Sequence, residues 1–486
     1  MLNLGLFIPE LTLAIFAILI VMLDLFIKPK DILRSVALSG LVVAGVISMA
    51  MWENNYAAIF NNMLAVDNFA VFFKLLFIVV AFFIILASAD YVSKFARFQG
   101  EYYALVLLST LGMMLMAATT DLISNYLALE LTSLSFCSLI CLLKEQKSTE
   151  AALKYLLLSA IASATLLYGM ALVFGFTGRT QLAEIARSLQ AMPPQTLLAS
   201  PALLLGIVLM IAGFGYKMAA VPFQMWVPDV YEGAPTTITA YLSVASKAAG
   251  FALVLRVFFS AFALPAWLAQ NWGAVFAALA ILSMTVGNIA AIPQTNIKRM
   301  LGYSSIAQAG YLMVGLATLG FASSDVLGRS GVLFFLTSYA FTNIGAFIAI
   351  IAISNRLGND EIANYSGIGK KAPLMALALT LCLVSLIGMP PAAGFMAKFY
   401  IFRAAVMHNL LWLVIIAVIN SVISAYYYLR VVKVMWFGEA AAVDTVPATG
   451  GLKLALTLCC LGVLLIGIVP GQFMSFAELA ARMFGY

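Results

Sequence analysis

Long apolar runs recur along almost the whole of this 486-residue sequence. About fourteen of them approach the roughly 20 residues that a helix needs to cross a hydrocarbon core about 30 Å thick. The composition is 64% hydrophobic and only 9% charged, which leaves too little polar surface for a water-soluble fold to hide these runs. In lipid, only helices and closed barrels satisfy the backbone hydrogen bonds, and the runs do not alternate with a period of two residues. The sequence therefore predicts an all-α, polytopic membrane protein.

The predicted spans can be threaded alternately across the membrane. They cover residues 4–27, 33–52, 69–89, 102–119, 122–143, 150–176, 201–221, 235–262, 266–291, 299–319, 329–354, 372–389 with 393–407, 409–436 and 452–475. One side of the membrane then collects only Arg179, Arg187, Arg329, Arg403 and Arg482. The other side collects Lys28, Lys30, Arg34, Lys94, Arg97, Lys144, Lys147, Lys298, Arg299, Arg356, Lys370, Lys371, Arg430, Lys433 and Lys453. The positive-inside rule makes this second side the cytoplasm and predicts that both termini lie outside.

Two stretches of the sequence look like helices that proline interrupts. One holds Pro222 within Gly215–Phe223, and the other holds Pro390 and Pro391 within Gly388–Phe395. Proline removes a backbone donor and clashes with the preceding turn, so each helix should kink or break there. Broken helices in two halves indicate a transport site built from repeats, although proline kinks also occur in ordinary membrane helices. On the first reading, the chain divides into a three-helix segment (1–100), two five-helix half-channel repeats (101–262 and 263–437) and a C-terminal helix (438–486).

Five charged residues fall inside apolar runs rather than between them. An ionised side chain near the bilayer centre costs roughly 3 kcal/mol, so such a residue faces the protein interior or water. By default it marks an ion or proton path. The five residues are Glu130, Lys154, Lys217, Lys247 and Lys398.

Lysine suits proton transfer because burial favours its neutral form, while a neighbouring carboxylate favours its charged form. Lys154 opens the predicted helix after Glu130 and is the expected ion-pair partner of that carboxylate. Lys217 lies one turn before the first proline break, and Lys398 follows the second. A small movement of the carboxylate would then load or release a proton. The alternative is that these charges form structural pairs that hold helices together.

Other charged residues are weaker candidates. Asp229 and Glu232 fall in a predicted cytoplasmic turn, which either shapes an access point or is simply solvated. Four more lie near predicted span ends, where snorkelling can bring a charge to the headgroups. These four are Glu10, Asp24, Lys74 and Arg256.

Motifs for metals and redox cofactors are missing from the sequence. The five cysteines all lie in apolar runs, none forms a CxxC pair, and the chain has one histidine. These residues cannot supply a Cys/His metal site. The sequence also has no phosphate-binding loop and no GxGxxG after a strand. We therefore expect no cofactor on this chain.

One motif is specific enough to suggest a family. From Lys217 to Asp229 the sequence reads Lys-x4-Pro-Phe-x2-Trp-x-Pro-Asp. Together with further stretches, this motif resembles the antiporter-like membrane subunits of respiratory complex I, and the resemblance covers nearly the whole chain. The further stretches are residues 127–133, 151–159, 245–247, 294–305 and 388–400.

This resemblance implies a fold of fourteen helices with two inverted five-helix repeats. It also implies roles along a proton path for the five charged residues. Glu130 resembles the carboxylate that biases the channel, and Lys154 resembles its ion-pair partner. Lys217 resembles the central proton carrier, Lys247 a bridge, and Lys398 the carrier of the second half-channel.

Three details bear on the position within the family. M-type subunits have glutamate where this chain has Lys398. L-type subunits carry a long lateral arm after their last helix, whereas this sequence ends soon after its last apolar run. The closest resemblance is therefore to the N-type subunits of bacterial NADH-quinone oxidoreductase. Many relatives carry histidine where this chain has Gln224 and Gln308. Because an amide cannot take up a proton near neutral pH, the resemblance does not carry histidine relay steps to these two positions.

The resemblance implies a proton-translocating subunit of NADH-quinone oxidoreductase in the bacterial inner membrane. Flavin, iron–sulfur clusters and the quinone site would then lie in partner subunits of the membrane complex, and nucleic acid would not be a partner. The alternative is a subunit of a multi-subunit sodium/proton antiporter, whose residues are similar. A structural anchor without transport is a third possibility.

Overall fold

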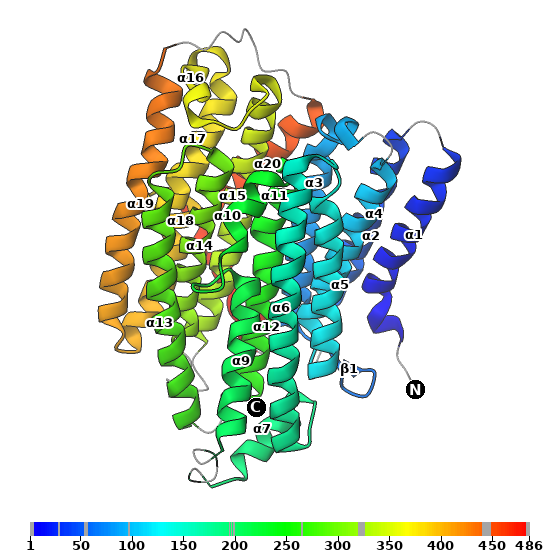
Figure 1. Cartoon of the computed structure of the whole chain (residues 1–486), viewed down its shortest axis with the longest axis vertical. Coiled ribbons are helices and arrows are strands. Elements are labelled where there is room, and N and C mark those ends of the chain that lie inside the picture. The colour runs from blue at the N-terminus through cyan, green and yellow to red at the C-terminus, as the bar shows by residue number, and fades with distance from the viewer. Residues whose placement is uncertain are drawn as a thin grey trace.

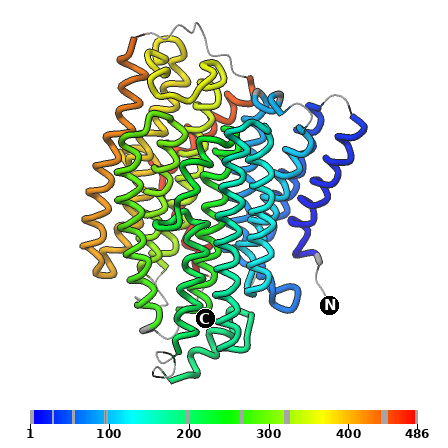
Figure 2. Tube along the Cα trace, viewed as in Figure 1, coloured from blue at the N-terminus to red at the C-terminus, as the bar shows by residue number. Residues whose placement is uncertain are grey.

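The computed structural model describes residues 4–482, apart from 28–29, 53–56, 96–97, 194, 196, 198–199, 264–265, 319–325 and 440–448. The described residues form a bundle of long helices that stand side by side (Figure 1). The chain progresses across this bundle from α1 at one edge to α19 at the opposite edge (Figure 2). The predicted cytoplasmic residues Lys28 and Arg97, and both chain termini, lie outside the described residues.

The first part of the bundle runs from the N-terminal helices to the end of the predicted first repeat. It comprises α1 (Ile8–Phe26), α2 (Asp31–Ala50), β1 (Ala57–Ile59), β2 (Leu64–Val66), α3 (Asn68–Ala87), α4 (Gln99–Ala118), α5 (Leu122–Ile140), α6 (Gln146–Thr177), α7 (Leu182–Gln190), α9 (Pro201–Met218), α10 (Trp226–Gly233), α11 (Thr236–Tyr241), η4 (Leu242–Ser246) and α12 (Lys247–Ser260). The strands β1 and β2 pair as a short antiparallel hairpin.

The second part continues to the C-terminal helices. It comprises α13 (Ala266–Ala291), α14 (Ile297–Leu316), α15 (Leu327–Leu357), η5 (Ile362–Tyr365), α16 (Ile368–Lys371), α17 (Pro373–Ile387), α18 (Ala393–Met407), α19 (Leu411–Phe437), α20 (Gly450–Ile468) and α21 (Pro470–Ala481). The short helix α16, which ends in Lys370 and Lys371, lies at the upper end of the bundle in Figure 1, and α7 lies at the lower end.

The prediction of an all-α membrane protein is confirmed. In the described part of the chain, twelve helical segments are long and apolar enough to cross a membrane. The remaining two predicted spans correspond to α14, which is 20 residues long, and to the pair α17–α18. The division into inverted repeats stays a prediction.

Both proline-containing spans are interrupted, as predicted. The helix α9 ends at Met218 and α10 begins at Trp226, while α17 ends at Ile387 and α18 begins at Ala393. A third irregularity lies at Lys247, which directly follows η4, a single π-helical turn between α11 and α12. Such π turns inside helices are common at functional sites.

Glycines allow two helix pairs to approach closely. A Cβ on Gly169 of α6 would lie 2.6 Å from the carbonyl oxygen of Gly206 on α9. A Cβ on Gly287 of α13 would lie 2.6 Å from the backbone nitrogen of Ala307 on α14. Because lipid provides no hydrophobic force between helices, close backbone packing at small residues is a main source of their association.

The snorkelling prediction is wrong for Glu10, Lys74 and Arg256. Lys74 on α3 forms an ion pair with Glu10 on α1 at 2.6 Å, and both side chains are almost completely buried. Arg256 on α12 forms a buried ion pair with Asp67, the residue that caps α3. The charges are buried because α3 is enclosed by other helices, so its ends meet protein rather than headgroups. The fourth residue, Asp24, is more accessible and pairs with Lys30 at 2.6 Å.

Candidate proton-transfer site

The buried Lys217 lies at the end of the broken helix α9 and faces α5. Its Nζ donates to Ser133 Oγ at 3.1 Å, and only 2% of the residue is exposed. Ser133 stands one turn after Glu130 on α5, so the carboxylate and the ammonium attract each other across this interface. Glu130 in turn accepts a hydrogen bond from Ser163 on α6. Glu130 therefore lies between Ser163, which hydrogen-bonds to it, and Lys217, whose ammonium it attracts.

The predicted pairing of Glu130 with Lys154 is wrong. Lys154 instead forms ion pairs with Asp229 on α10 and with Glu150, one turn earlier on its own helix, both at 2.8 Å. Its side chain is 42% exposed and reaches α10 rather than α5. Sequence spacing did not reveal which face of α6 lies against which neighbour.

Lys154 belongs to a charged cluster at a polar cavity of about 160 Å³. Arg299 of α14 also binds Asp229 there, at 2.6 Å, and reaches Glu232 at 3.1 Å. Partial burial alone would raise the pKa of the Asp229 carboxyl, but hydrogen bonds from Lys154 and Arg299 outweigh burial and hold that pKa below its ordinary value. The cluster joins α6, α10 and α14, and the predicted cytoplasmic turn is therefore a place of dense ion pairing.

Lys247 occupies the junction between the π turn η4 and α12. Its Nζ donates to the carbonyl oxygen of Ser305 on α14, and the ring of Tyr339 lies 5.7 Å away. Ser305 Oγ also donates to Tyr231 Oη at 3.3 Å. Lys247 is thus held by neutral groups and has no carboxylate partner in the described part of the chain.

Lys398 lies beside the second break, on α18. Its Nζ donates to the carbonyl oxygens of Leu386 and Ile387 at 3.3 and 2.8 Å and to Ser421 Oγ at 2.8 Å. The ring of Tyr311 lies 4.3 Å from the same nitrogen. Lys398 and Ser421 also line a cavity of about 530 Å³ between α18 and α19, so the buried ammonium borders open space.

The two glutamines have different surroundings. Gln224 lies within the first break, and its Oε1 is buried without a hydrogen-bond partner in the described structure. Gln308 on α14 is 2% exposed, and its Nε2 donates to the Leu386 carbonyl oxygen at 3.1 Å. Gln308 and Lys398 therefore share one acceptor, a connection that the sequence did not indicate.

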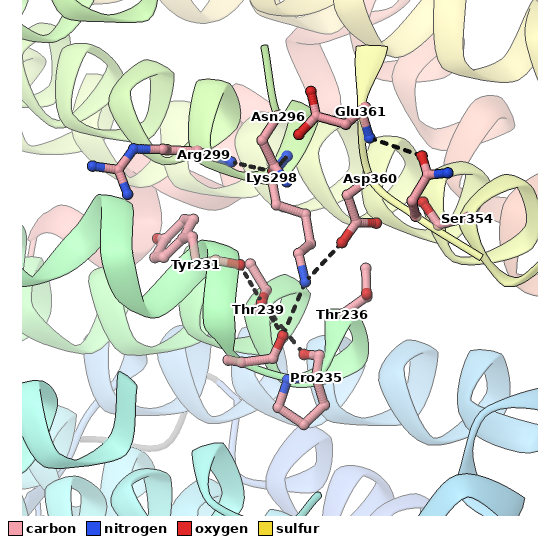
Figure 3. Close-up of polar contacts among 12 residues, drawn as sticks. Tyr231, Pro235, Thr236, Thr239, Asn296, Lys298, Arg299, Ser354, Asp360 and Glu361 are labelled. Atoms are coloured by element: carbon pink, nitrogen blue, oxygen red, sulfur yellow. Dashed lines mark hydrogen bonds and ion pairs between the residues drawn. The ribbon is translucent and has the colours of Figure 1, made fainter. Parts of the chain in front are cut away.

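Lys298, at the start of α14, is buried, although the sequence predicted that it lies in a cytoplasmic loop. Figure 3 shows the Lys298 side chain between Asp360 and the backbone turn at Pro235, while Arg299 points to the other side. Lys298 Nζ lies 3.1 Å from Asp360 and 3.1 Å from the carbonyl oxygen of Ala234. A positive charge at a helix N-terminus is unfavourable, and the ion pair with Asp360 compensates for the position of Lys298 at the start of α14. The position of Lys298 directly before the predicted span 299–319 gave no signal of its burial.

Glycine at position 388 lets Lys398 reach the break. Gly388 has φ of +90°, and a Cβ there would lie 2.9 Å from Lys398 Cδ. We expect Gly388→Ala to lower proton uptake several-fold, because it adds backbone strain of about 1–2 kcal/mol and also displaces the lysine. Gly358→Ala is the control, since Gly358 has φ of +73° but no atom within 4 Å of its added Cβ. Equal losses of uptake in the two variants would show that backbone strain alone accounts for the effect.

Comparisons with known proteins show the family to which this chain is similar. Residues 119–424 match the family model described as NADH:quinone oxidoreductase/Mrp antiporter, TM. NADH-quinone oxidoreductase subunit N of Dehalococcoides mccartyi is 50% identical, over 98% of this chain and 99% of the relative. A chain of respiratory complex I from Thermus thermophilus matches with a TM-score of 0.80 and 31% identity, covering 96% of this chain and 98% of that chain. A chain of the Mrp complex from Dietzia sp. has a TM-score of 0.85 and 19% identity, covering 99% and 97%, and shows likeness of fold alone.

Proposed function

This chain belongs to the family of NADH-quinone oxidoreductase subunit N, and we propose that it is a proton-translocating subunit of the membrane arm of that respiratory complex. The observation that carries the proposal is the placement of three buried lysines at three helix irregularities. Lys217 lies at the end of α9, Lys247 after the π turn, and Lys398 beside the second break. Irregular backbone inside a membrane protein is tolerated where it is buried in protein or lines a cavity, which is also where transported ions bind.

The contacts of these lysines support proton transfer rather than static pairing. Lys247 and Lys398 bind carbonyl and hydroxyl oxygens, which accept a hydrogen bond from either the charged or the neutral amine. Lys217 binds a hydroxyl and is attracted by Glu130. A proton can therefore leave each amine without stranding a buried counter-charge at hydrogen-bond distance.

We assign Lys217, Lys247 and Lys398 as proton carriers and Glu130 as the carboxylate that adjusts Lys217. Lys154 belongs to the exposed Asp229 cluster, where it would help to hold an access point for protons at the surface without itself carrying the proton. On this proposal the chain lies in the bacterial inner membrane with both termini on the periplasmic side. Its partners are other membrane-arm subunits, and flavin, iron–sulfur clusters and the quinone site lie on partner subunits.

Affinity purification of the tagged chain from its native membranes tests this proposal. The expected result is co-purification of subunits that contain flavin and iron–sulfur clusters, detected by absorbance and metal analysis, with quinone reductase activity. Recovery of only small membrane subunits without cofactors, together with sodium-dependent proton exchange, would instead identify an antiporter complex.

A further inference from the structure

The second break exposes two particular backbone carbonyls. In a continuous helix, the carbonyl of residue i accepts a hydrogen bond from the amide of residue i+4. For Leu386 and Ile387 these amides would belong to Pro390 and Pro391, and proline has no N–H. The sequence of the break therefore leaves two buried acceptors that only groups from elsewhere can satisfy.

Each of these carbonyls receives two side-chain donors. Lys398 donates to both, at 3.3 Å to Leu386 and at 2.8 Å to Ile387. Gln308 of α14 also donates to Leu386 at 3.1 Å. Ser421 of α19 also donates to Ile387 at 2.9 Å. Two neutral donors from two other helices thus duplicate the hydrogen bonds of the lysine.

The first break is built differently. Its carbonyl at Tyr216 is satisfied by the backbone of Ala219 and by the indole of Trp226, at 3.1 and 3.0 Å. Lys217 donates to Ser133 on another helix, and no hydrogen bond joins its ammonium to a carbonyl of this break in the described structure. What distinguishes the second break is that the lysine itself is one of the two donors to each carbonyl.

Lys398 has room to leave this position. It borders the cavity of about 530 Å³ between α18 and α19, which is also lined by Phe399 and Arg403. No carboxylate pairs with Lys398 in the described part of the chain, and Arg403 beside the cavity is positive. Among the described residues, the ammonium is held by the two carbonyls, Ser421 and the ring of Tyr311.

We propose that Gln308 and Ser421 are positioning residues that keep the carbonyls of Leu386 and Ile387 hydrogen-bonded when Lys398 turns toward the cavity to pass on its proton. This inference rests on the proposed role of Lys398 as a proton carrier. Without the two neutral donors, each departure of the lysine would leave two buried carbonyls unsatisfied. Such a loss would disfavour the departed state by about tenfold for each carbonyl.

The test uses variants of the whole complex in inverted membrane vesicles. Gln308→Met keeps the length of the side chain and removes its donor, and Ser421→Ala removes the hydroxyl. We expect the double variant to assemble normally, because Lys398 still caps both carbonyls, while proton uptake per quinone reduced falls by about tenfold or more. Lys398→Met alone should also assemble, with uptake lost, because Gln308 and Ser421 remain. Only the combination of all three changes should lose assembly.

Two controls separate positioning from general packing. Ser421→Thr keeps a hydroxyl at the same place and should restore uptake in place of Ser421→Ala. Ser424→Ala removes a buried hydroxyl one turn further along α19, which donates only to the Ser421 carbonyl at 2.6 Å, and should leave uptake unchanged.

The outcomes that overturn the inference are distinct. Normal uptake in the Gln308→Met, Ser421→Ala variant, with Lys398→Met inactive, refutes the positioning role while leaving the proposed function standing. Loss of assembly in that double variant shows that Gln308 and Ser421 are static structural donors. Normal uptake in Lys398→Met removes the carrier role of Lys398, and the inference falls with it.

Discussion

Replacement of Lys217 with methionine is expected to lower proton uptake by about a hundredfold or more, the range lost when a positioned proton-transfer group is removed. Methionine fills most of the volume, so the helices α5 and α9 should keep their packing. Glu130 keeps its hydrogen bond from Ser163 and is only partly buried, so the loss of the ammonium does not strand a fully buried charge. The measurement is proton uptake per quinone reduced in inverted membrane vesicles, with the amount of assembled complex determined by native electrophoresis.

Lys154→Met is the matched control for Lys217→Met. Lys154 is 42% exposed and its partner Asp229 is 32% exposed, so this pair contributes about 1 kcal/mol or less. We expect this variant to assemble and to retain most of its proton uptake. Normal uptake in Lys217→Met would reduce the row of lysines to structural polar packing. An equal loss in both variants would show that the buried position of Lys217 confers no special role.

The sequence predicted those features of the fold that depend on local chemistry. The breaks follow from Pro222 and from the pair Pro390 and Pro391, since proline cannot donate the helical hydrogen bond wherever it occurs. The buried lysines were identified by their cost in an apolar run, which is also a local property. For this reason the positions of Lys217 and Lys398 next to helix interruptions could be predicted without any contact information.

Features that depend on the packing of distant helices could not be predicted. Lys154 was assigned to Glu130 because the two helices are consecutive, but the face of α6 that carries Lys154 turns toward α10. Gln308 was interpreted as the loss of a proton-relay residue. Its role as a donor becomes visible only when α14 is placed against the end of α17.

The burial of charged residues near the ends of predicted spans could not be predicted either. Distance from the end of an apolar run measures depth in a bilayer only if the helix faces lipid. In the most apolar part of α3, 78% of the residues are buried within the protein. Lys74 and the cap residue Asp67 therefore contact other helices rather than lipid headgroups. Hydropathy does not distinguish a helix in lipid from one enclosed by helices of equal hydropathy.

Disruption of the buried ion pair between Arg256 and Asp67 is expected to have the largest effect on the stability of the protein. Arg256 Nη2 lies 2.9 Å from Asp67 Oδ1 and 2.8 Å from the carbonyl oxygen of Ala117, and the guanidinium lies 4.6 Å from the ring of Phe69. Asp67 Oδ1 also accepts the amide of Ala70 at 2.8 Å and so caps α3. One arginine on α12 therefore joins the ends of α3 and α4.

Arg256→Met should destabilise the protein by about 3–5 kcal/mol, because it leaves the Asp67 carboxylate buried and unpaired. The measurement is the thermal denaturation of the detergent-solubilised protein. Arg179→Met is the control, because the Arg179–Glu184 pair is 59% and 39% exposed and should contribute about 1 kcal/mol or less. Adding Asp67→Asn to Arg256→Met removes the stranded charge but keeps an oxygen to cap α3, so the double variant should regain much of the lost stability. If the single variant were as stable as the unmodified protein, the buried pair would be dispensable and α3 would be held by its apolar contacts alone.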